Sequence, residues 1–157
     1  MPAKPFIDLS TIDFDNLIVD RDGIYALNPH RHEFMLLDGI VHMSPEKKVI
    51  VGYRDVKEDE FWIRGHIPGR PLFPGVLMIE AAAQLVSYFA LRLQDRTDFL
   101  GFAGVTDVKF RGTVTVGDRL VMLGKMLELR DRRCVGDTQG YVNGQQVYQG
   151  RITGMWL

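Results

Sequence analysis

The sequence has little of what marks a disulfide-stabilised, nucleic-acid-binding or secreted protein. Cys134 is the single cysteine in 157 residues, which excludes an internal disulfide framework and a multi-cysteine zinc site. The 19 Lys and Arg nearly balance the 20 Asp and Glu, so no overall field favours nucleic acid or an anionic membrane surface. The N-terminal residues contain no continuous apolar run of the kind found in a secretory signal. We therefore expect a cytoplasmic protein.

Long apolar runs are also scarce, and one stretch approaches the length of a membrane span. Residues 76–93 are apolar almost all round, but Glu80, Gln84 and Arg92 lie among them. Such polar groups are costly in the hydrocarbon core of a bilayer. The stretch therefore predicts a buried helix and no membrane insertion.

The part of the chain before this helix predicts short strands and turns. Residues 1–22 form an Asp-rich lead-in that ends in a turn at Asp22–Gly23. After a break at Asn28–Pro29, a strand is expected to begin near Phe34. Residues 41–56 read as a strand pair, because apolar side chains alternate on either side of a Ser-Pro-Glu turn.

The helix and the rest of the chain define the fold class. Residues 74–94 have no Gly or Pro between position 76 and the end, and strand-like runs follow, with a strong hairpin signal at Asn143–Gly144. With 46% hydrophobic residues, the chain is long enough for one core. The pattern predicts one α+β domain over residues 1–157, in which an antiparallel sheet curls around one helix. An uncovered edge strand would favour self-association.

The densest candidate for chemistry is residues 64–84, where three prolines and three glycines precede the helix closely. A stiff loop of this kind holds groups in place, and it brings His66 towards the start of the helix. Glu80 projects from the helix itself, among apolar neighbours that should raise its pKa and keep it available as a proton donor. Alone, His66 could be a structural hydrogen bonder and Glu80 could form a salt bridge or reach solvent. Together they indicate an acid and base pair.

The segment GHIPGRPLFPGVLMIEAAAQ, residues 65–84, resembles the active-site segment of the FabZ-type beta-hydroxyacyl-acyl-carrier-protein dehydratases. The resemblance extends upstream through PHRHEFMLLD and downstream through FAGVTDVKFRGTVTVGDRL. Three positions depart from the family's usual pattern, which indicates a divergent member: Glu33, Gly39 and Ile67. A Glu at position 80 resembles the dehydratases more than the related dehydratase-isomerases.

The resemblance implies a hotdog fold and a homodimer with composite active sites, which in that family often assembles into a trimer of dimers. It implies that His66 and Glu80 are catalytic, that the Gly75 N–H binds the thioester carbonyl, and that Gln84 supports the site. A helix N-terminus favours negative charge, which agrees with the role of Gly75. The partner would be acyl carrier protein with its phosphopantetheine-linked acyl chain.

The expected reaction is removal of water from (3R)-3-hydroxyacyl-acyl-carrier-protein to give the trans-2-enoyl thioester in fatty acid biosynthesis. General acid–base catalysis needs no metal and no cofactor. The alternatives are a hotdog acyl thioesterase and a non-catalytic acyl-binding hotdog subunit. Coenzyme A in place of the carrier protein, and the acyl chain length, stay open.

Further candidates rest on residue type alone. Aromatic and long apolar side chains are candidates for an acyl tunnel: Phe61, Phe73, Met78, Phe102 and Phe110. Basic side chains are candidates for binding the acidic carrier protein: Arg111, Lys125, Arg130, Arg132 and Arg133. The histidines His30, His32 and His42 lack the spacing of a metal site, and we expect His30 to be structural.

Overall fold

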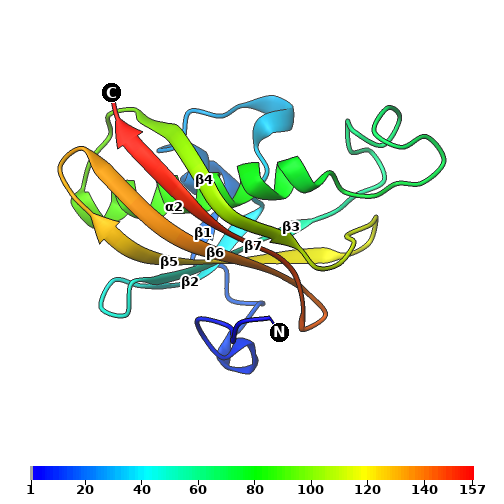
Figure 1. Ribbon diagram of the computed structural model, residues 1–157, viewed down its shortest axis with the longest axis horizontal. Helices are drawn as coiled ribbons and strands as arrows, with labels where there is room; N and C mark the ends of the chain where they lie inside the picture. Colours follow the sequence, from blue (N-terminus) through cyan, green and yellow to red (C-terminus); the bar gives the residue numbers. More distant parts are fainter. Residues whose placement is uncertain (1) are drawn as a thin grey trace.

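A computed structural model describes residues 2–157 of the chain and has one antiparallel sheet around one long helix (Figure 1). The seven strands are ordered β1-β2-β3-β5-β6-β7-β4. The elements in chain order are η1 (Leu9–Thr11), β1 (Val19–Asp20), α1 (Arg21–Tyr25), η2 (His32–Phe34), β2 (Gly39–Ser44), β3 (Val49–Asp55), α2 (Gly75–Gln94), β4 (Leu100–Phe110), β5 (Arg119–Leu129), β6 (Arg133–Val142) and β7 (Gln145–Trp156).

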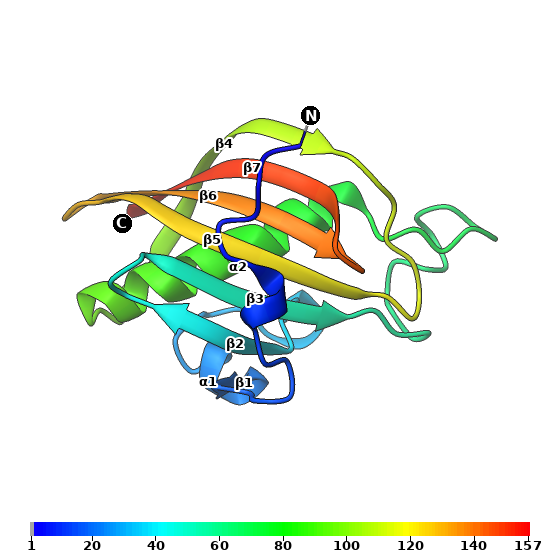
Figure 2. The same ribbon diagram turned by 90° about the horizontal axis from the view of Figure 1, so that it is seen from below.

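Helix α2 forms where the sequence predicts it and runs across the inner face of the curved sheet (Figures 1 and 2). Pro74 occupies its N-cap, and Asp95 ends it in the left-handed conformation. By length and composition α2 could cross a membrane, yet 61% of its most apolar window is buried inside the protein. The helix is the core helix, with Ala82, Leu85 and Phe89 completely or almost completely buried.

The sheet also follows the predicted pattern in most places. Strands β2 and β3 pair across the turn predicted after Ser44. The hairpin at Asn143–Gly144 has positive φ angles of 49° and 77°, as a two-residue turn of this type requires. Strand β4 stands at the edge of the sheet, and among residues 2–157 it pairs on one side only, with β7.

Two local predictions are wrong. Asp22–Gly23 lies inside α1 because the Asp20 side chain caps that helix, accepting from Gly23 N at 2.8 Å. No strand begins near Phe34, which closes the short 3-10 helix η2, and the next strand begins at Gly39. The backbone from Phe34 to Leu37 instead bonds to side chains of α1 and α2, which a local sequence pattern does not reveal.

The outer face of the sheet is covered by the N-terminal segment (Figure 2). Phe6, Ile7 and Leu9 pack against a second apolar cluster that includes Val51 and Leu123. This cluster lies on the side of the sheet away from α2. The lead-in residues therefore shield apolar surface that a bare sheet would expose.

The 56–74 connection between β3 and α2 projects beyond the start of the helix (Figure 1). Its two ends are anchored, since Trp62 stacks edge-on against Phe73 at 5.4 Å and Phe73 N donates to Val114 O at 2.7 Å. Its middle, including His66, is largely exposed. The chain thus has a fixed helix and a projecting loop close to the helix start.

Candidate active site

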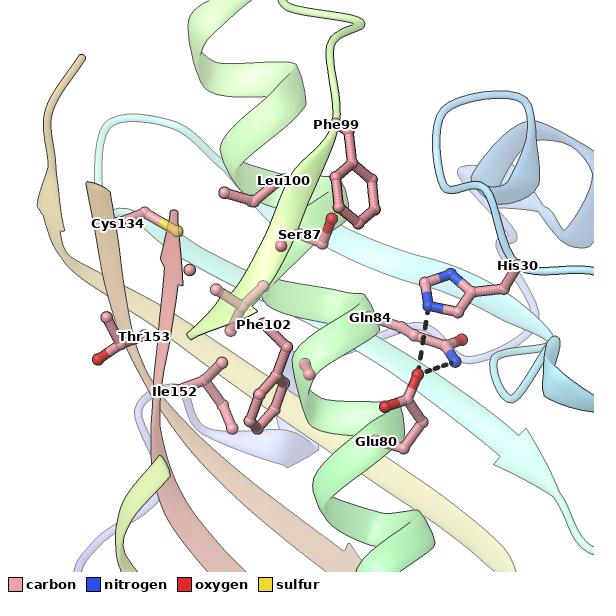
Figure 3. A pocket seen from close by; sticks show the side chains of 14 residues that line it. His30, Glu80, Gln84, Ser87, Phe99, Leu100, Phe102, Cys134, Ile152 and Thr153 are labelled. Atoms are coloured by element: carbon pink, nitrogen blue, oxygen red, sulfur yellow. Dashed lines mark hydrogen bonds and ion pairs between the residues drawn. The ribbon is translucent and has the colours of Figure 1, made fainter. Parts of the chain in front are cut away.

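Glu80 lies on α2 beside a pocket, and two side chains contact one of its carboxylate oxygens (Figure 3). The Gln84 amide, one helical turn further on, donates from Nε2 to Oε1 at 2.9 Å. His30 Nε2 lies 3.2 Å from the same oxygen. Within residues 2–157 no donor reaches Oε2. The carboxylate is therefore held by one oxygen, and the other is open to a substrate.

These contacts set the acidity of Glu80. The hydrogen bond to His30 has the largest effect and lowers the pKa of Glu80, burial acts in the opposite direction, and the Gln84 hydrogen bond lowers it further. The net pKa is below its usual value, because hydrogen bonds to a carboxylate favour the charged form. The raised pKa predicted from the apolar neighbours is therefore wrong for the single chain.

The pocket beside Glu80 has a polar end formed by His30, Glu80 and Gln84 (Figure 3). The other lining residues come from α2 and from the chain in and next to β4, β6 and β7: Ala83, Val86, Ser87, Phe99, Leu100, Gly101, Phe102, Cys134, Ile152, Thr153 and Gly154. A polar end that opens into a largely apolar space suits a functional group at the head of an acyl chain.

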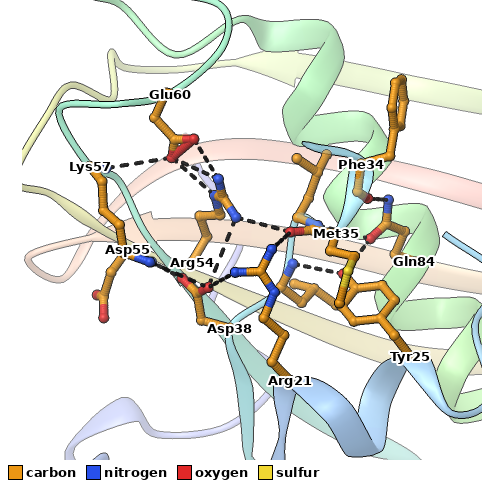
Figure 4. Close-up of polar contacts among 12 residues, drawn as sticks. Arg21, Tyr25, Phe34, Met35, Asp38, Arg54, Asp55, Lys57, Glu60 and Gln84 are labelled. Carbon is orange, nitrogen blue, oxygen red and sulfur yellow. Dashed lines mark hydrogen bonds and ion pairs between the residues drawn. The ribbon is translucent and has the colours of Figure 1, made fainter. Parts of the chain in front are cut away.

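Gln84 is held in place by hydrogen bonds to the chain between β1 and β2 (Figure 4). Its Oε1 accepts from Tyr25 OH at 2.6 Å and from Leu36 N at 3.3 Å. Its Nε2 donates to Phe34 O at 2.8 Å as well as to Glu80. The amide has one orientation that satisfies these partners, so the donor facing Glu80 is fixed.

A buried ion pair supports this segment from the other side (Figure 4). Arg54, on β3, pairs with Glu60 at the start of the projecting loop, and the two residues are 7% and 8% exposed. Arg54 also donates from Nη1 to Met35 O at 3.0 Å. The loop, the sheet and the backbone that holds Gln84 are thus connected by one guanidinium.

His66 lies elsewhere. It is exposed in the projecting loop, where its Nδ1 contacts Leu72 O at 3.0 Å. It does not line the pocket beside Glu80. In the described part of one chain, the predicted acid and base are therefore not brought together.

Gly75 is the first residue of α2, and its N–H has no acceptor within residues 2–157. A side chain here would require the Phe110 ring to move, because a Cβ added to Gly75 would lie 2.9 Å from that ring. The free N–H and the helix dipole both favour a partly negative oxygen at this point. This geometry is compatible with the predicted role in binding a carbonyl.

The predicted tunnel residues are scattered. Phe102 lines the pocket beside Glu80, whereas Phe73 and Met78 are buried in the core. Phe110 is half-exposed beside Gly75, and Phe61 is half-exposed near Arg54. The apolar character of a side chain can be read from the sequence, but the cavity that the side chain lines cannot.

The predicted basic residues lie at different ends of the sheet. Arg111 follows β4 at the end where α2 begins. Arg130, Arg132 and Arg133 lie at the turn between β5 and β6, near the end of α2, and Gln94 Nε2 donates to Arg130 O at 3.3 Å. Lys125 lies within β5, opposite Val49. They do not form one patch.

The sequence interpretation gave His30 only a structural role, and it did not predict the contact with Glu80. The two residues are 50 positions apart, and spacing along the chain carries no signal for such a pair. The sequence feature that could have indicated a role for His30 is the PHRHEF segment that contains it, because the resemblance to the dehydratases extends through this segment. Among residues 2–157, no group of three or more His, Cys, Asp or Glu is placed to hold a metal ion.

An antiparallel sheet wrapped around one central helix is the hotdog fold, and solved structures share it. The dehydratase heterocomplex ApeI:P from Xenorhabdus doucetiae matches with a TM-score of 0.73 and 17% identity, over 85% of this chain and 90% of that one. Zebra fish thioesterase superfamily member 2 matches with a TM-score of 0.66 and 12% identity, over 87% and 95%. At these identities the likeness shows the fold alone.

Sequence relatives identify the family. Residues 28–151 match the FabA-like domain family. The 3-hydroxyacyl-acyl-carrier-protein dehydratase FabZ of Clostridioides difficile is 36% identical over 136 residues, covering 86% of this chain and 95% of that protein. The FabZ of Desulfotalea psychrophila is 35% identical over 139 residues, covering 85% and 91%. The chain belongs to the FabA-like domain family and, within it, to the FabZ-type dehydratases.

One relative is longer. The bifunctional enzyme LpxC/FabZ of Chlorobaculum tepidum is 35% identical over 138 residues, which cover 87% of this chain and 29% of that protein. The match therefore accounts for less than a third of the bifunctional relative.

Proposed function

We propose that the protein is a hydro-lyase that dehydrates (3R)-3-hydroxyacyl-acyl-carrier-protein to the trans-2-enoyl thioester in fatty acid biosynthesis. The observation that carries the proposal is Glu80, a carboxylate with one free oxygen, at the polar end of a mostly apolar pocket. The FabZ relatives, which this chain matches over most of its length, are named 3-hydroxyacyl-acyl-carrier-protein dehydratases.

The reaction divides between three groups. His66 removes a C2 proton, which the neighbouring thioester acidifies, and the Gly75 N–H stabilises the enolate-like oxygen that forms. Glu80, which must first take up a proton against the lowered pKa that its contacts give it in the single chain, donates that proton to the C3 hydroxyl, which leaves as water while the C2–C3 double bond forms. Catalysis ends with a proton on His66 and a carboxylate at Glu80, so the proton must return before the next turnover.

A second copy of the chain supplies the missing base. His66 of one chain does not line its own Glu80 pocket, and β4 offers an unpaired edge at the side of the sheet nearest that pocket. Pairing of two β4 edges would cover exposed apolar side chains such as Phe102 and Phe99. We therefore expect a homodimer with composite sites, in which Glu80 of one chain meets His66 of the other.

The acyl chain would occupy the inner part of the pocket, past Phe102 towards Cys134. Gly154 allows the Cys134 and Leu100 side chains to pack close to the backbone there, because a Cβ at this position would lie 3.0 Å from Cys134 Sγ. The carrier protein would approach from the end of the sheet where α2 begins. Of the five basic candidates, Arg111 lies at that end.

The test is turnover of matched substrates. A (3R)-3-hydroxyacyl carrier thioester should lose water, and an acyl carrier thioester of the same length should not be hydrolysed. Hydrolysis of the acyl thioester without dehydration would instead support the thioesterase, and binding of both without turnover would support an acyl-binding subunit. Comparing hydration of crotonyl and longer enoyl carriers would give the preferred chain length.

A further inference from the structure

Within residues 2–157, the ring of His30 has a single polar partner, which is Glu80. Its Nε2 lies 3.2 Å from Glu80 Oε1. Its Nδ1 is buried and has no hydrogen-bond partner within residues 2–157. If the ring proton were on Nδ1, a buried N–H would lack an acceptor, so the proton belongs on Nε2. The ring is therefore a donor to Glu80.

Hydrogen bonds hold the backbone around His30, so the position of the Nε2 donor is fixed. Asn28 is 1% exposed and donates from Nδ2 to Gln84 O on α2 at 2.9 Å. Arg31 donates from Nη1 to Tyr25 O at 3.0 Å and to Asn28 O at 3.1 Å. The Tyr25 ring stands edge-on to the His30 ring at 6.3 Å. The histidine is thus held between two anchored residues, with its ring packed against a third.

Two donors on the same carboxylate oxygen have a chemical consequence. Gln84 and His30 both contact Oε1 of Glu80, so that oxygen cannot carry a proton without displacing one of them. When Glu80 is protonated, the proton belongs on Oε2. This is the oxygen free to meet a substrate hydroxyl.

We propose that His30 is a positioning residue for Glu80, which it holds by Oε1 so that the proton is carried on, and delivered from, Oε2. The proposal rests on the proposed function, in which Glu80 is the acid. It adds a residue from the segment between β1 and β2 to a site otherwise built from the helix and the projecting loop.

The other titratable groups near the carboxylate do not replace His30. Of the residues that line the pocket, Cys134 is the remaining titratable one, and burial raises the pKa of its thiol. Tyr25 lies behind Gln84, and burial raises the pKa of its hydroxyl. Both groups therefore stay uncharged near neutral pH. In a composite site, His66 from a second copy would be the remaining group to face Glu80.

The experiment compares His30→Gln with His30→Leu in the full-length protein. Glutamine places an N–H donor where Nε2 lies, whereas leucine fills the space without a donor. We expect kcat to fall about 10- to 100-fold in His30→Leu, as for a misplaced catalytic group, with KM changed less than about threefold. His30→Gln should keep kcat within about threefold of the unmodified protein.

The pH profile separates positioning from mere packing. The His30 hydrogen bond lowers the pKa of Glu80, so its loss raises that pKa. Because Glu80 must be protonated to act, the alkaline limb of the kcat profile should move to higher pH in His30→Leu and stay in place in His30→Gln. His42→Leu is the matched control, since His42 is another partly buried histidine, on β2, and should leave the profile unchanged.

Two results would overturn the proposal: unchanged kcat and pH profile in His30→Leu, or equal losses in the leucine and glutamine variants. Titration of the Glu80 carboxyl by ¹³C NMR gives an answer that does not depend on turnover. A higher Glu80 pKa in His30→Leu than in His30→Gln supports the positioning role even if the substrate differs from the one proposed. Equal values in both variants contradict it.

Discussion

The two halves of the candidate active site differ in how firmly one chain holds them. Glu80 lies on the core helix, and its Oε1 contacts two side chains that are themselves anchored. His66 lies in an exposed loop, and its ring has one contact, to Leu72 O. The carboxylate half is complete in the single chain, whereas the histidine half still needs a surface against which to pack.

The reason lies in the surroundings of each residue. Glu80 is enclosed by the core helix, the segment before β2 and the strands that line its pocket, so its partners are fixed by the fold. His66 lies between the two anchored ends of the 56–74 connection, where few side chains pack. A group with few contacts becomes precise only when further contacts are added, and a second chain at the β4 edge would supply them.

The largest effect should come from removing the acid, Glu80, from the carboxylate half of the site. In Glu80→Gln the amide keeps the size of the side chain but has no carboxylic proton, so turnover should fall about 10²- to 10⁴-fold. Folding should persist, and thermal unfolding together with kcat measures both. A kcat close to that of the unmodified protein would remove Glu80 from the mechanism.

The next prediction tests whether a second copy of the chain supplies His66 to the Glu80 pocket. His66→Ala and Glu80→Ala should each be inactive, and after joint unfolding and refolding about half of the dimers should be mixed, each with one intact site in two. Turnover per chain should return to about a quarter of the unmodified value. Each variant refolded alone is the control. If mixed dimers form and stay inactive, both residues belong to one chain.

A third prediction concerns the buried Arg54–Glu60 ion pair, which connects the projecting loop to the segment that holds Gln84. Glu60→Leu leaves the Arg54 guanidinium buried without its main partner, which should cost about 3–5 kcal/mol of unfolding free energy. Glu128→Leu removes the partner of Arg130 in a pair whose arginine side chain is 76% exposed, and should cost about 1 kcal/mol or less. Urea unfolding of both variants makes the comparison. Equal losses would show that the buried pair is not the anchor.

The smallest effect is expected from removing the Tyr25 hydroxyl, which donates to the Gln84 side chain. Tyr25→Phe removes a hydroxyl that donates to Gln84 and accepts from Leu37 N, so the free energy of unfolding should fall by about 1–3 kcal/mol. Tyr141→Phe is the matched control, because the Tyr141 hydroxyl is buried without a partner within residues 2–157. Its removal should be nearly neutral. The prediction fails if chemical denaturation gives the two variants the same stability.

The sequence predicted most of the fold because the relevant signals are local. An apolar stretch without Gly or Pro predicts α2, and Asn143–Gly144 predicts its hairpin. The predicted strand near Phe34 failed because the backbone there bonds to Tyr25 and Gln84 side chains, which lie far away along the chain. Tertiary hydrogen bonds overrode the local preference.

The sequence by itself determined the family, the central helix and the residue types of the candidate site, since a long motif places His66, Gly75 and Glu80 at fixed spacing. Only the tertiary structure decided which residues meet. It placed His30 against Glu80 across 50 positions, reversed the expected direction of the Glu80 pKa, and left His66 outside that pocket. Hydrogen bonds and burial depend on distances in space, and these arise only when the sheet closes around the helix.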